Sequence, residues 1–129
     1  MGKNYRLLAA GALERWSVIG WALRARLAAR RAVLGGGFRG LDLPSAPRTS
    51  VDRSRDVKRV LSVTASKCLV TSAVLQEWYA AQGRPYDLVI GVKSPREGFA
   101  AHAWLDMPGE VIVGYTEITR VPARSGEDA

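Results

Sequence analysis

Apolar side chains recur every three or four positions through the first third of the chain. Between residues 5 and 34, leucine, isoleucine, valine, alanine and tryptophan follow one another at these spacings, with arginines between them. This is the period of an amphipathic helix. Gly11 and Gly20 weaken the pattern, so it also allows two shorter helices. The run Gly35–Gly37 ends the helix, and residues 38–49, which include two prolines, are predicted to form a loop.

Two more helices are predicted in the middle of the chain. Residues 50–62 place acidic side chains early, basic side chains late and valines and a leucine on one side, which suits a helix and its dipole. A third helix is predicted to begin near Ser66, its expected N-cap residue, and to end at Gly83 with Pro85 just beyond.

After residue 85 the pattern changes to short apolar runs. Asp87–Val92, Phe99–Leu105 and Val111–Tyr115 are predicted strands. Met107–Glu110 is a predicted turn that joins the last two, but its Pro-Gly pair favours a turn type that leaves the register uncertain by one residue. Helices followed by strands predict an α+β fold, with N-terminal helices and a third helix packed on a small antiparallel sheet.

The positive charge of the chain is confined to its first part. Residues 1–50 carry nine basic and two acidic side chains, whereas residues 51–129 carry ten of each. We therefore expect the N-terminal helices, through Arg24, Arg26, Arg30 and Arg31, to dock onto an acidic surface of a partner. The pI of 10.2 also suggests a nucleic-acid-binding protein. The aromatic side chains do not interleave with the basic ones as in known modules, however, so we expect no nucleic-acid partner.

Composition limits the remaining classes. One cysteine excludes an internal disulfide, and one cysteine with one histidine cannot form a zinc cluster, so we expect no metal and no cofactor. The longest uncharged apolar stretch near the start, Trp16–Leu23, is far shorter than the roughly 20 residues of a membrane span. A cytoplasmic location is the simplest expectation. We divide the chain into an N-terminal helical region (1–47), a catalytic domain (48–121) and a flexible tail (122–129).

Cys68 and His102 are the candidates for covalent chemistry. Cys68 is expected in the first turn of the third helix, where unbonded backbone N–H groups and the helix dipole favour a thiolate. His102 lies in the apolar strand Phe99–Leu105. A lone cysteine is more often an inert buried residue, and a lone histidine is more often structural. A thiol at a helix start and an imidazole on a later strand are, together, what cysteine–histidine catalysis requires.

Three segments around these residues resemble a known family. Cys68–Ser72, Leu88–Val92 and Phe99–Trp104 are similar to the transglutaminase-like peptidase domain of lasso-peptide maturation, most closely to the stand-alone peptidase half of a split lasso-peptide B protein. The resemblance covers about residues 50–118. It implies a papain- or transglutaminase-like core in which Cys68 cuts the leader from a ribosomally made precursor peptide.

The resemblance also implies partners. A separate recognition protein would hold the leader, and an ATP-using lasso cyclase would close the ring afterwards. Acyl transfer to an amine stays open as an alternative, because hydrolysis and transfer share the same thioester intermediate. A non-catalytic protein on this fold is the third interpretation.

The third catalytic residue is not assigned by the sequence. The family has a carboxylate on the strand after the histidine, about a dozen residues further on, where this chain has Gly114. The remaining candidates are Glu117, Asp106 and Glu110. Asp106 is about 13 Å along the strand from His102, and Glu117 would need a bulge or a slip of its strand. The alternative that a backbone carbonyl or another polar group orients the His102 imidazole stays open.

Two further features have functional and structural interpretations. Trp104 shares a strand face with His102 and is either a wall of the substrate site or part of the core. The loop of residues 94–98 joins two strands close to His102 and is a weaker candidate for substrate contact.

Overall fold

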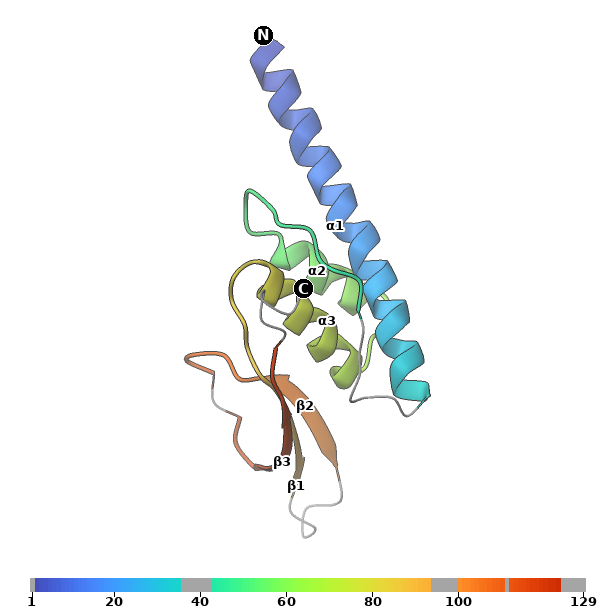
Figure 1. Ribbon diagram of the computed structural model, residues 1–129, viewed down its shortest axis with the longest axis vertical. Coiled ribbons are helices and arrows are strands. Elements are labelled where there is room, and N and C mark those ends of the chain that lie inside the picture. The colour runs from blue at the N-terminus through green and yellow to red at the C-terminus, as the bar shows by residue number, and fades with distance from the viewer. Residues whose placement is uncertain (1, 36–42, 94–99, 111, 124–129) are drawn as a thin grey trace.

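The fold places three helices on one side of a three-stranded sheet (Figure 1). A computed structural model describes residues 2–35 (with side chains from residue 11), 43–93, 100–110 and 112–123. The helices are α1 (Gly2–Leu34), α2 (Ser54–Val63) and α3 (Cys68–Ala81). The strands are β1 (Leu88–Lys93), β2 (Ala101–Leu105) and β3 (Tyr115–Val121). The predicted α+β class, with the cysteine-bearing helix on a small antiparallel sheet, is confirmed.

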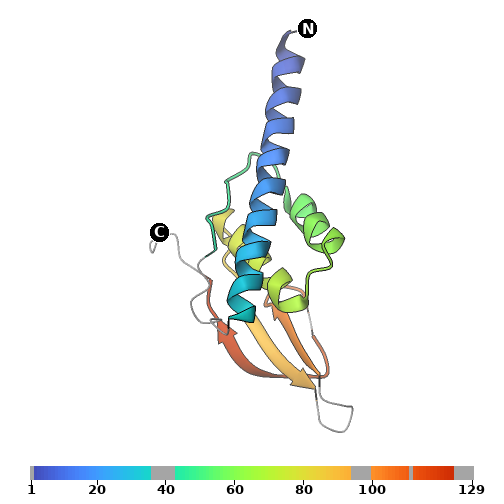
Figure 2. The ribbon, with the colours of Figure 1, turned by 90° about the vertical axis from the view of Figure 1, so that its right-hand side faces the viewer.

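The first helix is continuous. α1 passes through both Gly11 and Gly20, so of the two alternatives the single helix is correct. Each glycine costs a helix only about 1 kcal/mol. That cost is small beside the burial of one side of α1, where Val18 and Trp21 are completely buried. The first half of α1 projects well beyond the other elements (Figures 1 and 2).

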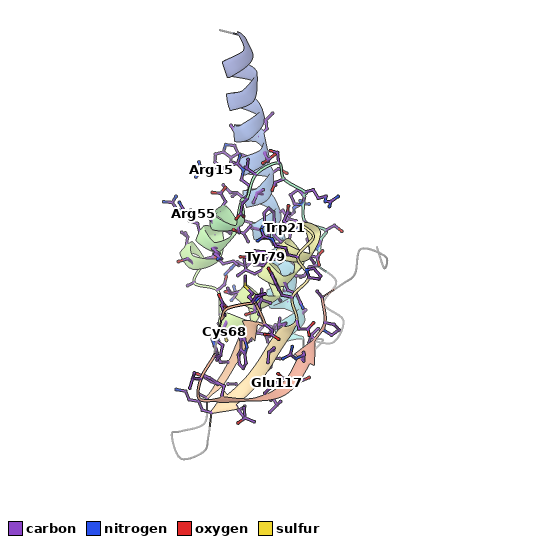
Figure 3. All side chains as sticks on the ribbon, turned by 90° about the vertical axis from the view of Figure 1, so that its left-hand side faces the viewer. Arg15, Trp21, Arg55, Cys68, Tyr79 and Glu117 are labelled. Atoms are coloured by element: carbon purple, nitrogen blue, oxygen red, sulfur yellow. The ribbon has the colours of Figure 1, made fainter. Side chains whose placement is uncertain are left out.

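The core lies between the helices and the sheet. Trp21 of α1, labelled in Figure 3, packs there against Trp78 of α3, with ring centroids 5.8 Å apart. The indole N–H of Trp21 donates to the carbonyl oxygen of Pro44 at 2.8 Å, which fixes the connection after α1 to the core. Leu88, Ala103 and Leu105 of the sheet face this cluster. α1 therefore packs in the same core as α3, while the division of the chain at residues 47 and 48 stays a prediction.

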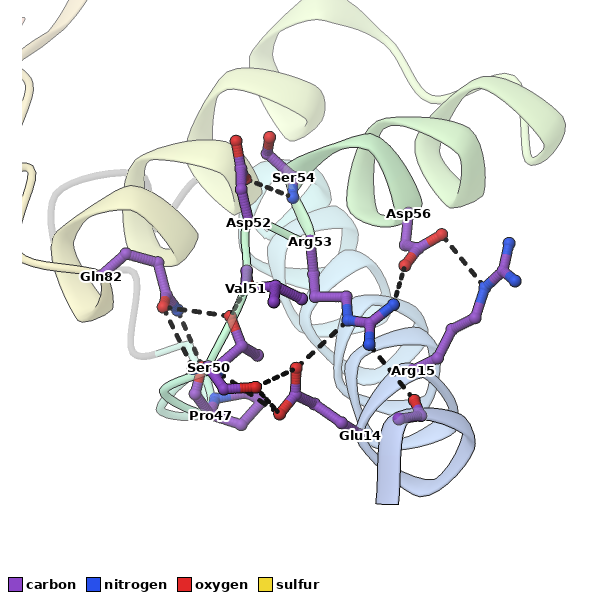
Figure 4. Close-up of polar contacts among 12 residues, drawn as sticks. Glu14, Arg15, Pro47, Ser50, Val51, Asp52, Arg53, Ser54, Asp56 and Gln82 are labelled. Atoms are coloured by element: carbon purple, nitrogen blue, oxygen red, sulfur yellow. Dashed lines mark hydrogen bonds and ion pairs between the residues drawn. The ribbon is translucent and has the colours of Figure 1, made fainter. Parts of the chain in front are cut away.

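A polar cluster joins α1 to the segment that leads into α2 (Figure 4). Glu14 accepts a hydrogen bond from Arg53 at 3.2 Å and another from the Ser50 hydroxyl at 3.0 Å. Asp56 forms ion pairs with Arg15 at 3.3 Å and with Arg53 at 3.9 Å. Desolvation raises the pKa of Glu14, but the bonds from Arg53 and Ser50 together outweigh it and leave the pKa below its ordinary value.

The sheet differs from the predicted hairpin. All pairs are antiparallel, but the strand order is β2-β1-β3, so β3 pairs with β1 and not with β2. The predicted strand at Val111–Tyr115 is also wrong, because β3 begins at Tyr115 and runs to Val121. The connection between β2 and β3, residues 106–114, is longer than a two-residue hairpin turn, and Gly109 and Gly114 in it have positive φ. The more apolar β1 takes the centre, where both of its edges are paired.

Candidate active site

Cys68 is the first residue of α3. Lys67 is the N-cap, with extended backbone angles and no capping side-chain bond, so the prediction that Ser66 caps this helix is wrong. The Ser66 hydroxyl instead accepts a hydrogen bond from Nε of Arg26 at 3.0 Å and shares one with the Thr64 hydroxyl at 3.1 Å. The start of α3 is the end of the helix nearer the sheet (Figure 3).

A tight turn between α2 and α3 sets the position of Cys68. The N–H of Ser66 donates to Leu61 O and the N–H of Ala65 to Ser62 O, both at 3.0 Å, which is the Schellman pattern of a helix end. Ala65 has φ of 52°, a left-handed conformation that glycine usually supplies. Arg26 reaches across from α1 and also donates to Thr64 O at 3.3 Å. The turn is therefore held by the first helix as well as by its own backbone.

The first turn of α3 presents free hydrogen-bond donors. The first backbone bond of the helix runs from the N–H of Thr71 to Lys67 O at 2.9 Å. The N–H groups of Cys68, Leu69 and Val70 have no acceptor among the described residues. The Cys68 side chain is partly buried against the edge of the core. A partly accessible sulfur beside unbonded N–H groups is suited to acyl transfer, in which an oxyanion forms next to the sulfur.

His102 belongs to an aromatic cluster on the sheet. Its ring centroid lies 5.9 Å from that of Trp104, in a stacked arrangement, and 5.3 Å from that of Tyr115. The rings of Trp104 and Tyr115 are 6.0 Å apart, and Nζ of Lys93 lies 5.5 Å from the centre of the Tyr115 ring. Trp104 thus belongs to this cluster and not to the core between helices and sheet, while its proposed contact with substrate stays a prediction.

The aromatic cluster and Cys68 lie on different sides of the sheet. Side chains alternate along β2, and Ala103 and Leu105 face the helices. The Ser72 hydroxyl of α3 donates to Ala103 O at 3.2 Å, so β2 runs directly beside the helix that carries Cys68. His102 and Trp104 occupy the opposite face. No hydrogen bond joins Cys68 to His102 in the described part of the chain, and their catalytic pairing stays a prediction.

Glu117 lies in the same cross-strand row as His102. Gly91 pairs with His102 on one side and with Glu117 on the other, and the register of β3 shifts just beyond this row. The strand bulge that the sequence analysis required for Glu117 to reach His102 is therefore present. The row is about 10 Å from end to end, however. A methyl group at Gly91 would lie 2.7 Å from Cη2 of Trp104, so the indole edge fills the position between His102 and Glu117.

Arg120 engages two of the three candidate carboxylates. It forms ion pairs with Glu117 and Asp106, both at 2.7 Å, and with Asp87 at 3.1 Å. The hydrogen bond from Arg120 lowers the pKa of Glu117, and the same three carboxylates raise the pKa of Arg120, led by Glu117. Glu110 lies in the turn after β2, where its N–H donates to Met107 O at 3.2 Å. The third catalytic residue stays unassigned.

Some of these residues were not identified from the sequence. Arg26 was grouped with the exposed arginines of α1, but its bonds to the α2–α3 turn make it a structural residue. Arg26 follows the buried Ala22 by one helical turn, and this spacing was the available sign that its side chain lies near the core. Tyr115 and Arg120 carry no local motif, and only the strand order brings them to the sheet face of His102. The loop of residues 94–98 lies outside the described residues.

The comparisons with known proteins identify the family. Within the described residues no helix has the length and apolar character needed to cross a membrane. Neither the curated proteins nor the solved structures contain a match to this chain. The family model described as "Transglutaminase-like superfamily" matches residues 7–121, which include all three strands and most of α1. This superfamily includes cysteine peptidases and acyl transferases and is typically cysteine-dependent. The chain belongs to the transglutaminase-like superfamily.

Proposed function

We propose that this protein is a cysteine peptidase that removes the leader from a ribosomally made lasso-peptide precursor. A separate recognition protein holds the leader, and a lasso cyclase acts on the released core peptide. Membership of a superfamily of cysteine-dependent enzymes supports the chemistry. The resemblance of Cys68–Ser72 and Phe99–Trp104 to lasso-peptide peptidases supports the substrate.

The observation that carries the proposal is the position of Cys68 at the start of α3. The Cys68 thiolate attacks the carbonyl carbon of the scissile peptide bond, and the carbonyl oxygen becomes an oxyanion. The free N–H groups of the first helical turn are the donors closest to that oxygen. The C–N bond then breaks, the leaving amine takes a proton from His102, and a thioester remains on Cys68. Water, deprotonated by His102, hydrolyses the thioester and restores the thiol.

The mechanism requires His102 to approach the sulfur. A working pair needs the ring nitrogen and the sulfur in hydrogen-bond contact, about 3 Å apart or somewhat more. β2 is an edge strand, so it is attached to the sheet on one side only. The His102 ring is half-buried, and among the described residues its contacts are ring stacking and not hydrogen bonds. We assign to the binding of the leader complex a change in β2 that turns its His102 face toward α3, as a one-residue shift of register would.

The test is cleavage of the precursor by single variants. The precursor and the recognition protein are mixed with Cys68→Ala, His102→Ala or the unchanged chain, and peptide masses are followed with time. Cys68→Ala should abolish cleavage, and His102→Ala should slow it by at least about 100-fold, the usual contribution of a general base. Lys67→Ala, which changes the exposed neighbour of Cys68, is the matched control and should retain activity. Undiminished cleavage by Cys68→Ala would refute the proposal.

Acyl transfer is the second candidate, because the superfamily includes acyl transferases. Both reactions pass through the same thioester, and only the acceptor differs. The precursor is incubated with the enzyme and an excess of a primary amine such as a lysine derivative. A product whose mass includes the amine identifies transfer, whereas free leader with a carboxyl end identifies hydrolysis.

A further inference from the structure

A large apolar groove lies between α1 and α2. Its volume is about 720 Å³. Trp16, Ile19 and Leu23 line it from α1, and Val60 and Val63 line it from α2. The exposed fraction is 71% for Trp16 and 79% for Val63, although both side chains are strongly apolar. An exposed apolar surface of this kind on a small protein indicates a binding site for another macromolecule.

The shape of the groove suits a helix. The residues along its α1 side, Ala12, Trp16, Ile19 and Leu23, are four, three and four positions apart and so form one stripe. At 1.5 Å per residue this stripe is about 17 Å long, which corresponds to about three turns of a third helix lying alongside. The paired helices α1 and α2 would then supply the two walls of a helix-in-groove site.

The charges at the groove select an acidic occupant. Arg59 lines the groove, is exposed, and has no ion-pair partner among the described residues. Asp56 also lines the groove, but its carboxylate is already paired with Arg15 and Arg53. The exposed Arg55 and Lys58 lie on the same helix and line the neighbouring pocket, so they add positive charge beside the groove and not within it. A second copy of this chain is a poor occupant, because the N-terminal part of each copy carries nine basic and only two acidic side chains. Like charges brought together at an interface oppose association.

We propose that the groove between α1 and α2 binds an acidic amphipathic helix of a partner protein, about three turns long. Apolar side chains of that helix lie against Trp16, Leu23 and Val63, and its carboxylates lie beside Arg59 and its basic neighbours. The inference goes beyond peptide cleavage and does not depend on Cys68. Its test therefore measures binding alone.

The probe is a designed, fluorescein-labelled 18-residue helix with leucines on one face and glutamates on the others. Binding to the full chain carrying Cys68→Ala is followed by fluorescence anisotropy at low and high salt. We expect binding that weakens as salt rises, because charge pairing contributes to it. Trp16→Ala and Val63→Ala should each weaken binding at least about tenfold, as expected for apolar side chains at the centre of an interface. Arg59→Glu should weaken it and restore binding of a lysine-for-glutamate probe.

Controls separate the groove from general stickiness and from misfolding. Leu34→Ala removes an exposed leucine from the same helix but outside the groove, and should change affinity less than about twofold. Trp16→Phe should keep most of the affinity and remove any blue shift of tryptophan emission on binding. Circular dichroism shows whether each variant is folded.

Four outcomes would overturn the proposal. A scrambled peptide of the same composition that binds equally well would show that the groove has no preference for an amphipathic helix. Affinity that is unchanged in Trp16→Ala and Val63→Ala would place binding elsewhere, as would displacement of the probe by a DNA duplex with no dependence on these residues. Self-association that is lost in Trp16→Ala, measured by sedimentation, would make a second copy the occupant instead.

Discussion

The two faces of the small sheet differ in composition and in what they support. The face toward the helices carries Leu88, Ala103 and Leu105 and completes the core around Trp21 and Trp78. The opposite face carries the rings of His102, Trp104 and Tyr115 and the ion pairs of Arg120. Both faces are built from the same strands, and along β2 they alternate residue by residue. The residues that hold the fold together are thus adjacent in sequence to those with candidate chemistry.

This alternation limits how the candidate dyad can be assembled. Cys68 belongs to the helix side of the sheet and His102 to the other side, so rotation of a single side chain does not bring the ring to the sulfur. Only a strand at the edge of a sheet can move relative to a helix without breaking two ladders. β2 is such a strand, while the central β1 is not. If Cys68 and His102 form the dyad, the face of β2 that carries His102 has to turn toward α3, as a one-residue shift of register would achieve.

The largest difference between the faces is expected at two neighbouring core residues. Leu88 and Val89 are both 1% exposed, but Leu88 faces the helices and Val89 lies under Trp104 on the other face. Leu88→Ala should lower the free energy of unfolding by about 2–5 kcal/mol, because it opens a cavity in the main core. Val89→Ala removes two carbons from the smaller cluster and should cost nearer 2 kcal/mol. Urea denaturation measures both, and a larger loss in Val89→Ala than in Leu88→Ala would contradict the distinction between a main and a minor core.

Gly91 offers a second test of the difference between the two faces of the sheet. A methyl group there would lie 2.7 Å from the Trp104 ring and 2.9 Å from the backbone oxygen of Thr116. The ring can move, but the oxygen is a backbone atom of the paired strand β3 and can move only with that strand. Gly91→Ala should therefore lower the free energy of unfolding by about 1–3 kcal/mol. Tryptophan fluorescence should change with it, since the indole of Trp104 is displaced.

The same substitution in α1 should have a smaller effect of opposite sign. A methyl group at Gly20 would meet no atom within 4 Å, and the residue lies in the middle of a helix. Gly20→Ala should raise the free energy of unfolding by about 0.4–1 kcal/mol, chiefly because alanine restricts the unfolded chain. Thermal unfolding of the two glycine variants side by side is the measurement. A loss of stability in Gly20→Ala would contradict this prediction, because it would mean that the added methyl group meets a neighbouring atom after all.

The sequence predicted local structure better than it predicted pairing. The helical period, the stop at Gly83 and the shared strand face of His102 and Trp104 are local, and each was identified correctly. The strand order was not identified. The residues around Met107 do not indicate that the chain after β2 crosses to the other edge of β1 and forms β3 there. The N-cap of α3 was misassigned because the hydroxyl of Ser66 is used by Arg26, a residue 40 positions away. The face of β2 that meets α3 likewise depends on packing, and this decides where His102 points.

The smallest expected effect is a pH dependence on the outer face of the sheet. The hydrogen bond from Arg120 lowers the pKa of Glu117 in the folded protein. A lowered folded pKa means that Glu117 stabilises the fold at pH values above its unfolded pKa, about 4.3, and loses this contribution as the pH falls through the folded value. The stability difference between the unchanged chain and Glu117→Gln should therefore be constant near pH 7 and shrink as the pH falls below about 4.3.

A double-mutant cycle isolates this contribution from the other acidic groups. Glu14 and Asp52 also have lowered pKa values, so the unchanged chain loses stability in acid for more than one reason. In the Arg120→Gln background, Glu117→Gln should have almost no effect at either pH, because its partner is absent. Added salt should reduce the difference in the unchanged background, since all members of the cluster are well exposed. If Glu117→Gln had the same effect with and without Arg120, the charge cluster would play no part in holding Glu117.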